Sequence, residues 1–256
     1  MEDTQLTISI LEPSVCKGDY IDRIKQAKSV LCFTGSGISA DSGLQTFRDA
    51  KGIWSNFNPL TLATKNGYLR NPEKAWKFYQ ERKKEYDCAE PNLAHNILAE
   101  MEKYYDKFII ATQNIDGLHQ KAGNRNVVEL HGNYNKYKCL KEDKPIKLED
   151  NINNGIPRCE CGSMIRPDVV FFNEKLDEKK FRKVYDFIYK GVDLCFIIGT
   201  KGIVAPANEI PIMTHYKGAF TIDINPEKSL FNDKLVDLRL KGKASEVLNE
   251  IWKQIE

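Results

Sequence analysis

The sequence lacks any long apolar run and has no marked excess of charge of one sign. A membrane-spanning helix needs about 20 consecutive apolar residues, and the runs here are much shorter. The formal net charge is +2, so neither a nucleic-acid stripe nor a basic membrane-binding surface is expected. The first dozen residues carry acids and no basic group, which is atypical of a secretory signal. These absences predict a cytoplasmic protein without direct nucleic-acid or membrane contacts.

The cysteines do not form the pattern of a disulfide framework. There are seven, an odd number, scattered through a chain of 256 residues. This usage favours a reducing compartment, and a chain of this length can bury a large core. Cys32 and Cys195 lie within apolar runs and are expected in that core.

Short apolar runs alternate with helical patterns along most of the chain. Such alternation predicts an α/β fold with a parallel sheet covered by helices on both faces. Strands are expected at 30–33, 108–112, 127–130, 169–172, 194–198 and 219–224. Helices are expected at 19–28, 91–103, 177–189 and 243–255, a mostly helical subdomain at 59–86, and a small Lys-, Asn-, Pro- and Gly-rich insert at 134–166.

Polar and glycine-containing loops follow several of the expected strands. In parallel sheets ligands bind at the carboxyl ends of strands, and a glycine-rich turn after a first strand can hold a dinucleotide pyrophosphate. A tight strand-to-helix turn is the alternative for that single piece. The loops are Gly35-Ser36-Gly37, Gln113-Asn114-Ile115-Asp116, His131-Gly132, Gly199-Thr200 and Asn225-Pro226.

Six segments together closely resemble the sirtuins, the NAD-dependent protein lysine deacylases, in that family's order and spacing. They are 34–54, 112–123, 128–133, 165–174, 199–200 and 224–226. The resemblance implies a single catalytic unit over 1–256, with a Rossmann-like domain and a smaller domain. The Rossmann-like part would cover approximately 1–48, 92–133 and 167–256, the helical module 49–91, and the zinc-ribbon-like module 134–166.

The resemblance also implies which residues bind NAD. The glycine-rich turn would hold the phosphates, a flexible loop would cover the nicotinamide end, and the loops at 199 and 225 would line the adenosine side. The residues concerned are Gly35, Ser36, Gly37, Ala40, Phe47, Arg48, Trp54, Gln113, Asn114, Ile115, Asp116, His131, Gly199, Thr200, Asn225, Pro226 and Ala244.

His131 and Asn114 are the catalytic residues that the resemblance implies. In the family's reaction the acyl oxygen attacks the ribose carbon and nicotinamide leaves. A ribose hydroxyl, deprotonated with the help of the histidine, then takes the acyl group, which gives free lysine and 2′-O-acyl-ADP-ribose. Histidine suits the base role because its pKa lies near neutrality. Taken by itself, a histidine before a glycine is more often a turn residue.

Tyr79 and Arg82 resemble the Tyr-x-x-Arg pair of the sirtuin branch that removes succinyl and malonyl groups. A separation of three residues places both side chains on one helical face, and an arginine fork matches a carboxylate. Val169 and Phe172 would contact the peptide. A packed tyrosine beside a solvated arginine is the alternative, with simple deacetylation as the corresponding activity.

A zinc site is expected from Cys139, Cys159 and Cys161. Structural zinc takes four ligands, commonly from two pairs of cysteines. Glu142 stands where the second cysteine of the first pair is expected, so the fourth ligand is open, with Glu142 as a candidate. The alternative is a module that keeps its fold without metal.

Two further departures from the family pattern are Lys201, in place of a small hydroxyl residue, and Asn173, in place of glycine. Neither removes a catalytic group. The expected partners are acyl-lysine proteins or peptides, and the chain is expected to act as a monomer. The rival functions are a mono-ADP-ribosyltransferase or NAD glycohydrolase on the same fold, a non-catalytic NAD-binding module, and a dehydrogenase.

Overall fold

The computed structural model describes residues 9–10, 17–47, 52–148 and 155–256. In these residues the largest element is a seven-stranded sheet with the order β1-β10-β9-β8-β2-β3-β4. Neighbouring strands are parallel except for β1 against β10. The strands are β1 (Ser9–Ile10), β2 (Ser29–Thr34), β3 (Lys107–Thr112), β4 (Val127–Glu129), β8 (Leu194–Ile198), β9 (Phe220–Asn225) and β10 (Leu238–Lys241).

Strand β2 is the point at which the strand order reverses. The chain runs from β2 to β3 and β4 on one side and later returns to β8 on the other side. Val30 is therefore in register with both Phe108 of β3 and Leu194 of β8. Sheets of this kind bind ligands outside the carboxyl ends of the strands at such a switch point.

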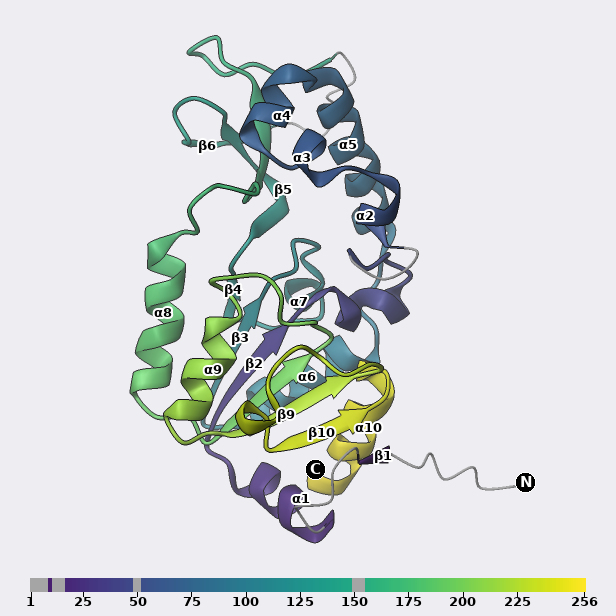
Figure 1. The fold of residues 1–256 in the computed structure, drawn as a ribbon, viewed down its shortest axis with the longest axis vertical. Coiled ribbons are helices and arrows are strands. Elements are labelled where there is room, and N and C mark those ends of the chain that lie inside the picture. Colours follow the sequence, from purple (N-terminus) through teal and green to yellow (C-terminus); the bar gives the residue numbers. More distant parts are fainter. Residues whose placement is uncertain (1–8, 11–16, 48–51, 149–154) are drawn as a thin grey trace, which may run out of the picture.

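Helices cover both faces of the sheet, which confirms the predicted fold class (Figure 1). Leu98 and Leu248 belong to the buried cluster on one face, and Val184 and Ile210 to the cluster on the other. Each such side chain contributes roughly 1.5–3 kcal/mol by burial. The first face carries α1 (Lys17–Gln26), α6 (Leu93–Tyr104) and α10 (Ala244–Ile255), and the second carries α8 (Glu178–Tyr189) and α9 (Glu209–Tyr216).

The expected helical subdomain is divided into separate helices. Asn58 and Thr64 cap two of them by accepting hydrogen bonds from backbone N–H groups, and Pro72 begins the longest. Such caps and an N-terminal proline favour new helix starts. The helices are α2 (Ile53–Asn56), α3 (Pro59–Leu62), α4 (Lys65–Arg70) and α5 (Pro72–Cys88).

A second, three-stranded sheet lies together with helices α2 to α5 above the ends of the large sheet (Figure 1). Its order is β6-β5-β7, with β5 at Gly132–Cys139, β6 at Pro145–Ile146 and β7 at Ile165–Val169. The predicted strand at 169–172 is therefore wrong. The extended segment begins at Ile165 and pairs antiparallel with β5, with Val169 opposite Gly132.

Gly132 is required at this pairing. It has a φ of 88°, and a Cβ atom there would lie 1.9 Å from the carbonyl oxygen of Asp168. The chain can therefore turn from β4 into β5 only with glycine directly after His131.

Several elements were not predicted. They are β1, β5, β6, α7 (Leu118–Lys121), α9, β10 and the 3₁₀ helices η1 (Ser36–Ser42) and η2 (Asp233–Leu235). Among the described residues, no helix is both long and apolar enough to span a membrane. Cys32 and Cys195 are fully buried, as expected.

Candidate active site

A cavity of about 790 Å³ opens between the carboxyl ends of the large sheet and the two small modules. Most of the expected site residues line it, although they come from segments far apart in the sequence. These residues are Gly35, Ser36, Gly37, Ala40, Phe47, Trp54, Tyr79, Arg82, Gln113, Asn114, Ile115, His131, Val169, Phe172, Gly199, Thr200, Asn225 and Pro226. Asp116 and Ala244 are buried and do not line the cavity, and Arg48 lies outside the described residues.

The glycine-rich turn after β2 packs against the turn after β8. The N–H of Gly37 donates to the carbonyl of Gly199 at 2.9 Å, and a Cβ atom on Gly37 would lie 2.7 Å from the Cα of Gly199. The two backbones can approach so closely only because neither residue has a side chain. This contact forms the floor of the cavity at the switch point, where a pyrophosphate would meet backbone N–H groups.

The imidazole of His131 is oriented by the loop after β3. Its Nδ1 lies 3.1 Å from the carbonyl oxygen of Gln113. A carbonyl only accepts, so Nδ1 carries the proton and the basic lone pair is on Nε2. This tautomer is the one that a general base on the cavity wall requires.

Asn114 on the cavity wall and Asp116 behind it share a hydrogen-bond network with Ser39. The Ser39 hydroxyl donates to Asp116 Oδ2 at 2.8 Å and accepts from Asn114 Nδ2 at 3.1 Å. The N–H of Leu118 donates to Asp116 Oδ1 at 3.0 Å. Burial raises the pKa of the Asp116 carboxyl, while these hydrogen bonds lower it. Ser39 therefore orients both side chains, a role that the sequence alone did not reveal.

Two histidines lie beneath this network and do not line the cavity. The rings of His95 and His119 are 5.0 Å apart, and His119 Nε2 is 2.9 Å from the Thr34 hydroxyl. Burial lowers the pKa of His95 to about 4 and holds the pKa of His119 well below its usual range. Both rings are therefore neutral near pH 7.

Aromatic side chains form the end of the cavity next to α5. The ring of Tyr79 stacks on Phe171 with centroids 5.9 Å apart, and its hydroxyl donates to the carbonyl of Leu62 at 3.2 Å. Burial raises the pKa of Tyr79, so the phenol stays protonated. Arg82 also lines this end, and its guanidinium pairs with Glu85 at 2.6 Å. A largely aromatic chamber that contains the Arg82 guanidinium and the Tyr79 phenol can therefore accept an acyl chain.

The opposite end of the cavity is lined by the loops after β8 and β9. Asn225 is held by its amide N–H₂, which donates to Asp223, and Asp223 is paired in turn with Arg239. Lys201 Nζ lies 3.7 Å from Glu227 Oε2 at the rim.

Asn173 adopts a φ of 71° between Phe172 and Glu174. This is a left-handed conformation that asparagine tolerates better than most residues. The replacement of glycine at this position therefore leaves the backbone turn intact.

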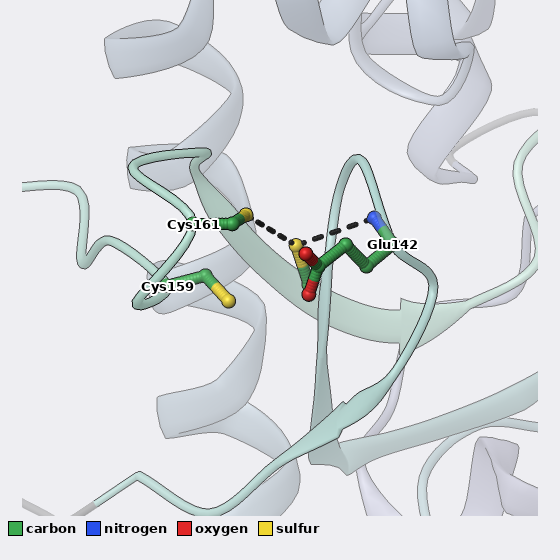
Figure 2. A group of neighbouring side chains, drawn as sticks. Glu142, Cys159 and Cys161 are labelled. Carbon is green, nitrogen blue, oxygen red and sulfur yellow. Dashed lines mark hydrogen bonds between the residues drawn. The ribbon is translucent and has the colours of Figure 1, made fainter.

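The three predicted cysteines and Glu142 converge in the small sheet module (Figure 2). Their ligand atoms all lie within 4.8 Å of one another, and the Sγ atoms of Cys139 and Cys161 are 3.5 Å apart. Tetrahedral zinc with bonds of about 2.3 Å to sulfur separates its sulfurs by about 3.8 Å. The N–H of Glu142 donates to Cys139 Sγ at 3.4 Å and lowers the pKa of that thiol to about 7. The donor set therefore fits structural zinc.

Some cavity residues were not singled out from the sequence. Phe78, Tyr86, Tyr134 and Phe171 surround the acyl end. Their signal in the sequence was only the aromatic richness of α5 and of the segments around it, which is equally typical of a packed core.

Comparisons with known proteins agree with this geometry. Residues 35–206 match the model of the Sir2 family. The chain is 37% identical over 226 residues to an NAD-dependent protein deacylase of Aquifex aeolicus (strain VF5), covering 88% of this chain and 94% of that protein. It is 39% identical over 245 residues to an NAD-dependent protein deacylase of Pyrococcus furiosus, covering 93% and 97%.

Solved structures are similar over nearly the whole chain. A Sir2 homologue in complex with NAD has a TM-score of 0.86 at 33% identity, with 94% of each chain covered. A Sir2 structure with a p53 peptide and NAD⁺ has a TM-score of 0.81 at 30% identity, with 94% of this chain and 98% of that chain covered. The family model covers more than half of this sequence, and the chain belongs to the Sir2 family.

Proposed function

We propose that this protein is an NAD-dependent protein lysine deacylase. The observation that carries the proposal is the position of His131. It lies on the wall of one cavity that joins the glycine-rich switch point to the aromatic chamber. The dinucleotide and the acyl-lysine would meet beside its imidazole. The relatives named as NAD-dependent protein deacylases and the family's NAD complex support the same conclusion.

Each group has a role that follows from its chemistry. NAD supplies a ribose carbon from which nicotinamide can leave. His131 Nε2 takes the proton of a ribose hydroxyl, because Nδ1 is held as a donor by the Gln113 carbonyl. Asn114, which lines the cavity, would hold the nicotinamide ribose or amide, and Asp116 behind it keeps Asn114 oriented through Ser39. The aromatic chamber excludes water from the acyl group.

The stoichiometry of nicotinamide release tests this activity. A deacylase releases one nicotinamide for each acyl group lost from an acetyl-lysine peptide. A glycohydrolase releases nicotinamide without any peptide, and a mono-ADP-ribosyltransferase gives a peptide whose mass increases. A non-catalytic module releases no nicotinamide at all. Any of these last three results would overturn the proposal.

Tyr79 and Arg82 extend the proposal to succinyl- and malonyl-lysine. Both line the aromatic end of the cavity, where a guanidinium can bind a carboxylate at the tip of the acyl group. Glu85 already pairs with one Arg82 nitrogen, so an acyl carboxylate would use the remaining N–H groups. Acetyl-lysine remains the second candidate substrate, because the chamber walls are apolar.

Arg82→Met separates the two acyl preferences. Loss of charge-assisted hydrogen bonds worth about 1.5–3 kcal/mol should lower kcat/KM on a succinyl peptide by about 10- to 100-fold, with the acetyl peptide little affected. Lys83→Met on the same helix, which removes the pair with Asp87, is the matched control. Equal effects on both peptides would exclude the acidic pocket.

We also propose that Glu142 supplies the fourth zinc ligand. It stands three residues after Cys139, and its carboxylate lies within the ligand cluster. Lys144 Nζ, 3.0 Å from Glu142 Oε2, lowers the pKa of this carboxyl and keeps it ionised. X-ray absorption should find three sulfurs at about 2.3 Å and one oxygen at about 2.0–2.2 Å.

Substitutions at this position give the sharper test. Glu142→Cys should change the zinc shell to four sulfurs, and Glu142→Ala should weaken zinc binding. Glu160→Ala, at a carboxylate that is 97% exposed, should change neither. An unchanged zinc affinity in Glu142→Ala would mean that water is the fourth ligand. The monomeric state and the cytoplasmic location remain predictions.

A further inference from the structure

Arg166 of β7 is the largest fully buried side chain among the described residues, with 2% of its side chain exposed. Removing a guanidinium from water is costly unless it is paired and hydrogen-bonded. Arg166 is not one of the proposed catalytic residues, so catalysis does not explain why it is buried. The contacts of its guanidinium do explain it.

The guanidinium holds the segment that follows β7 at three points. Nη2 donates to both carboxylate oxygens of Glu174, at 2.7 and 2.8 Å, and Nη1 donates to the carbonyl of Val169 at 3.1 Å. Its planar face lies 4.1 Å from the ring centroid of Phe171. Glu174 Oε2 accepts, in addition, the backbone N–H of Phe171 at 3.0 Å. One side chain thus fixes both ends of the turn and the ring between them.

This segment is a wall of the cavity. Val170 donates its backbone N–H to the carbonyl of His131 at 2.8 Å, and Phe172 donates to the carbonyl of Ala63 at 2.7 Å. Phe171, Phe172 and Glu174 line the cavity. The Phe171 ring also stacks on Tyr79 at 5.9 Å. Arg166, Phe171 and Tyr79 therefore form a continuous stack that ends at the acyl chamber.

The NAD end of the cavity has no comparable link to Arg166. Its turns rest on the contact between Gly37 and Gly199 and on the network of Ser39 with Asn114 and Asp116. None of the described contacts of Arg166 reaches these groups. Apart from the Val170 bond to the His131 carbonyl, a disturbance at Arg166 should therefore act on the acyl-peptide side of the site and leave the glycine-rich turns of the cofactor side in place.

We propose that Arg166 is a positioning residue for the acyl-lysine substrate, an inference that rests on the proposed deacylase function. It sets the Phe171 ring and the backbone of 170–174 in the geometry that receives the peptide and its acyl chain. Asp143, 3.8 Å from Arg166 Nη2, follows Glu142 in the metal turn. The same arginine thus joins the metal module to the substrate wall.

Arg166→Lys tests the proposal, because lysine keeps the charge but loses the planar, bidentate contact. We expect kcat/KM for an acyl peptide to fall by about 100-fold, the loss that a misplacement of about 1 Å can cause. The change should appear mainly as a higher KM for the peptide, with an unchanged KM for NAD. Glu174→Gln and Phe171→Leu disturb the same contacts from their other sides and should give the same split.

Arg158→Lys is the matched control, because this exposed arginine of the same module donates only to the Gly162 carbonyl at 2.8 Å among its described hydrogen bonds. It should leave both KM values unchanged, and zinc content should be equal in all variants. Equal losses toward peptide and NAD, or unchanged peptide KM values in all three variants, would overturn the positioning role.

Direct binding distinguishes this failure from failure of the proposed function. Calorimetry with a non-hydrolysable acyl-lysine peptide measures peptide affinity without turnover. Weaker binding in Arg166→Lys would support the positioning role even if no acyl group were removed. Equal binding to the native chain and the variant would reject the role even if the enzyme were an active deacylase.

Discussion

The large sheet and the small sheet are held together by different interactions. The large sheet buries an extended apolar cluster on each face, including Phe196 and Leu31. The small sheet has a small buried cluster of its own, Cys139, Cys159 and Ile165, and shares its other buried side chains, such as Tyr134 and Val169, with the cluster of the helical module. Lys138 of β5 pairs with Asp168 of β7 and with Asp143 in the turn after β5, and Cys139 of β5 lies in the candidate zinc site with Glu142, Cys159 and Cys161. A small module with so little apolar core depends on cross-links.

Stability and substrate support are divided between the two sheets of this protein. Apolar burial fixes the strand ends that hold the cofactor turns. The metal module fixes β7, from which Arg166 supports the substrate wall. The cavity lies between the two parts, so each part can be disturbed separately and its effect on the other measured.

Metal removal should give the largest difference between the two sheets. Structural zinc contributes about 10–16 kcal/mol of apparent binding energy in small zinc modules, whereas the large sheet has no ligand of this kind among the described residues. Hydrogen exchange after treatment with a chelator should increase in β5 and β7 and stay low in β2 and β8. A uniform increase across both sheets would show that they unfold as one unit.

Phe196→Ala should act on the large sheet instead. Phe196 is fully buried in β8, so its truncation should cost about 3–5 kcal/mol of unfolding free energy. Denaturant unfolding measures this loss, and zinc content should not change. Leu230→Ala, at a side chain that is 72% exposed, is the control and should have little effect. A loss of zinc in Phe196→Ala would contradict the independence of the two sheets.

The pH dependence of stability should come from the large-sheet part. The pKa of His95 is about 4 in the folded chain and 6.5 in the reference state. Between these values the unfolded chain binds more protons, so stability falls as pH falls, by up to about 3 kcal/mol. Above about pH 6.5 the contribution of His95 to the free energy of unfolding is constant. His119, whose pKa is also lowered, adds in the same direction.

His95→Asn should reduce this slope, as measured by unfolding at a series of pH values between 4 and 7. The metal module should show no part of the effect in hydrogen exchange at those pH values as long as zinc stays bound. A slope identical to that of the native chain would contradict the buried neutral state of His95.

The smallest effect is expected for ion pairs. Lys103 and Glu100 form an exposed pair on α6, so Lys103→Ala should cost less than about 1 kcal/mol. Lys138 is only 13% exposed and contacts two carboxylates of the small sheet, so Lys138→Ala should cost more. Thermal unfolding of the two variants measures the difference. Equal losses would show that the small sheet gains nothing from its ion pairs.

The sequence predicted the large sheet well because its strands are short continuous apolar runs. Such runs are typical of strands buried on both faces, and β2, β3 and β8 appear close to the expected ranges. Strand β10 was missed because its buried Arg239 interrupts the apolar pattern and pairs with Asp223 from β9. That partner is distant in sequence, so no local pattern reveals the pairing.

The predicted strand at 169–172 was wrong for a related reason. Four apolar residues in a row indicated a buried strand of the large sheet, but β7 ends at Val169. Phe171 is instead buried in the cluster of the helical module, and the half-buried Phe172 lines the cavity. The burial of the charged Arg166 within β7 has no signal in the local pattern, because its partner Glu174 lies beyond the turn at Asn173.

The turns that line the candidate site could be predicted from the sequence. The residues that hold these turns and walls in place could not. Turns such as Gly35-Ser36-Gly37 and the loop at Gln113 have recognisable residue types at strand ends. Ser39, Phe171 and Arg166 act by contacts that form only after the modules pack together. Packing of this kind leaves little trace in local sequence patterns.

The most direct test of the central claim is the mass spectrum of the nucleotide product. The native chain and His131→Ala would be incubated with NAD and an acyl-lysine peptide. We predict acyl-ADP-ribose from the native chain and a loss of this product in His131→Ala of at least about 100-fold, the range of general base catalysis. Formation of plain ADP-ribose with an intact acyl peptide, or an equally active His131→Ala, would contradict the account.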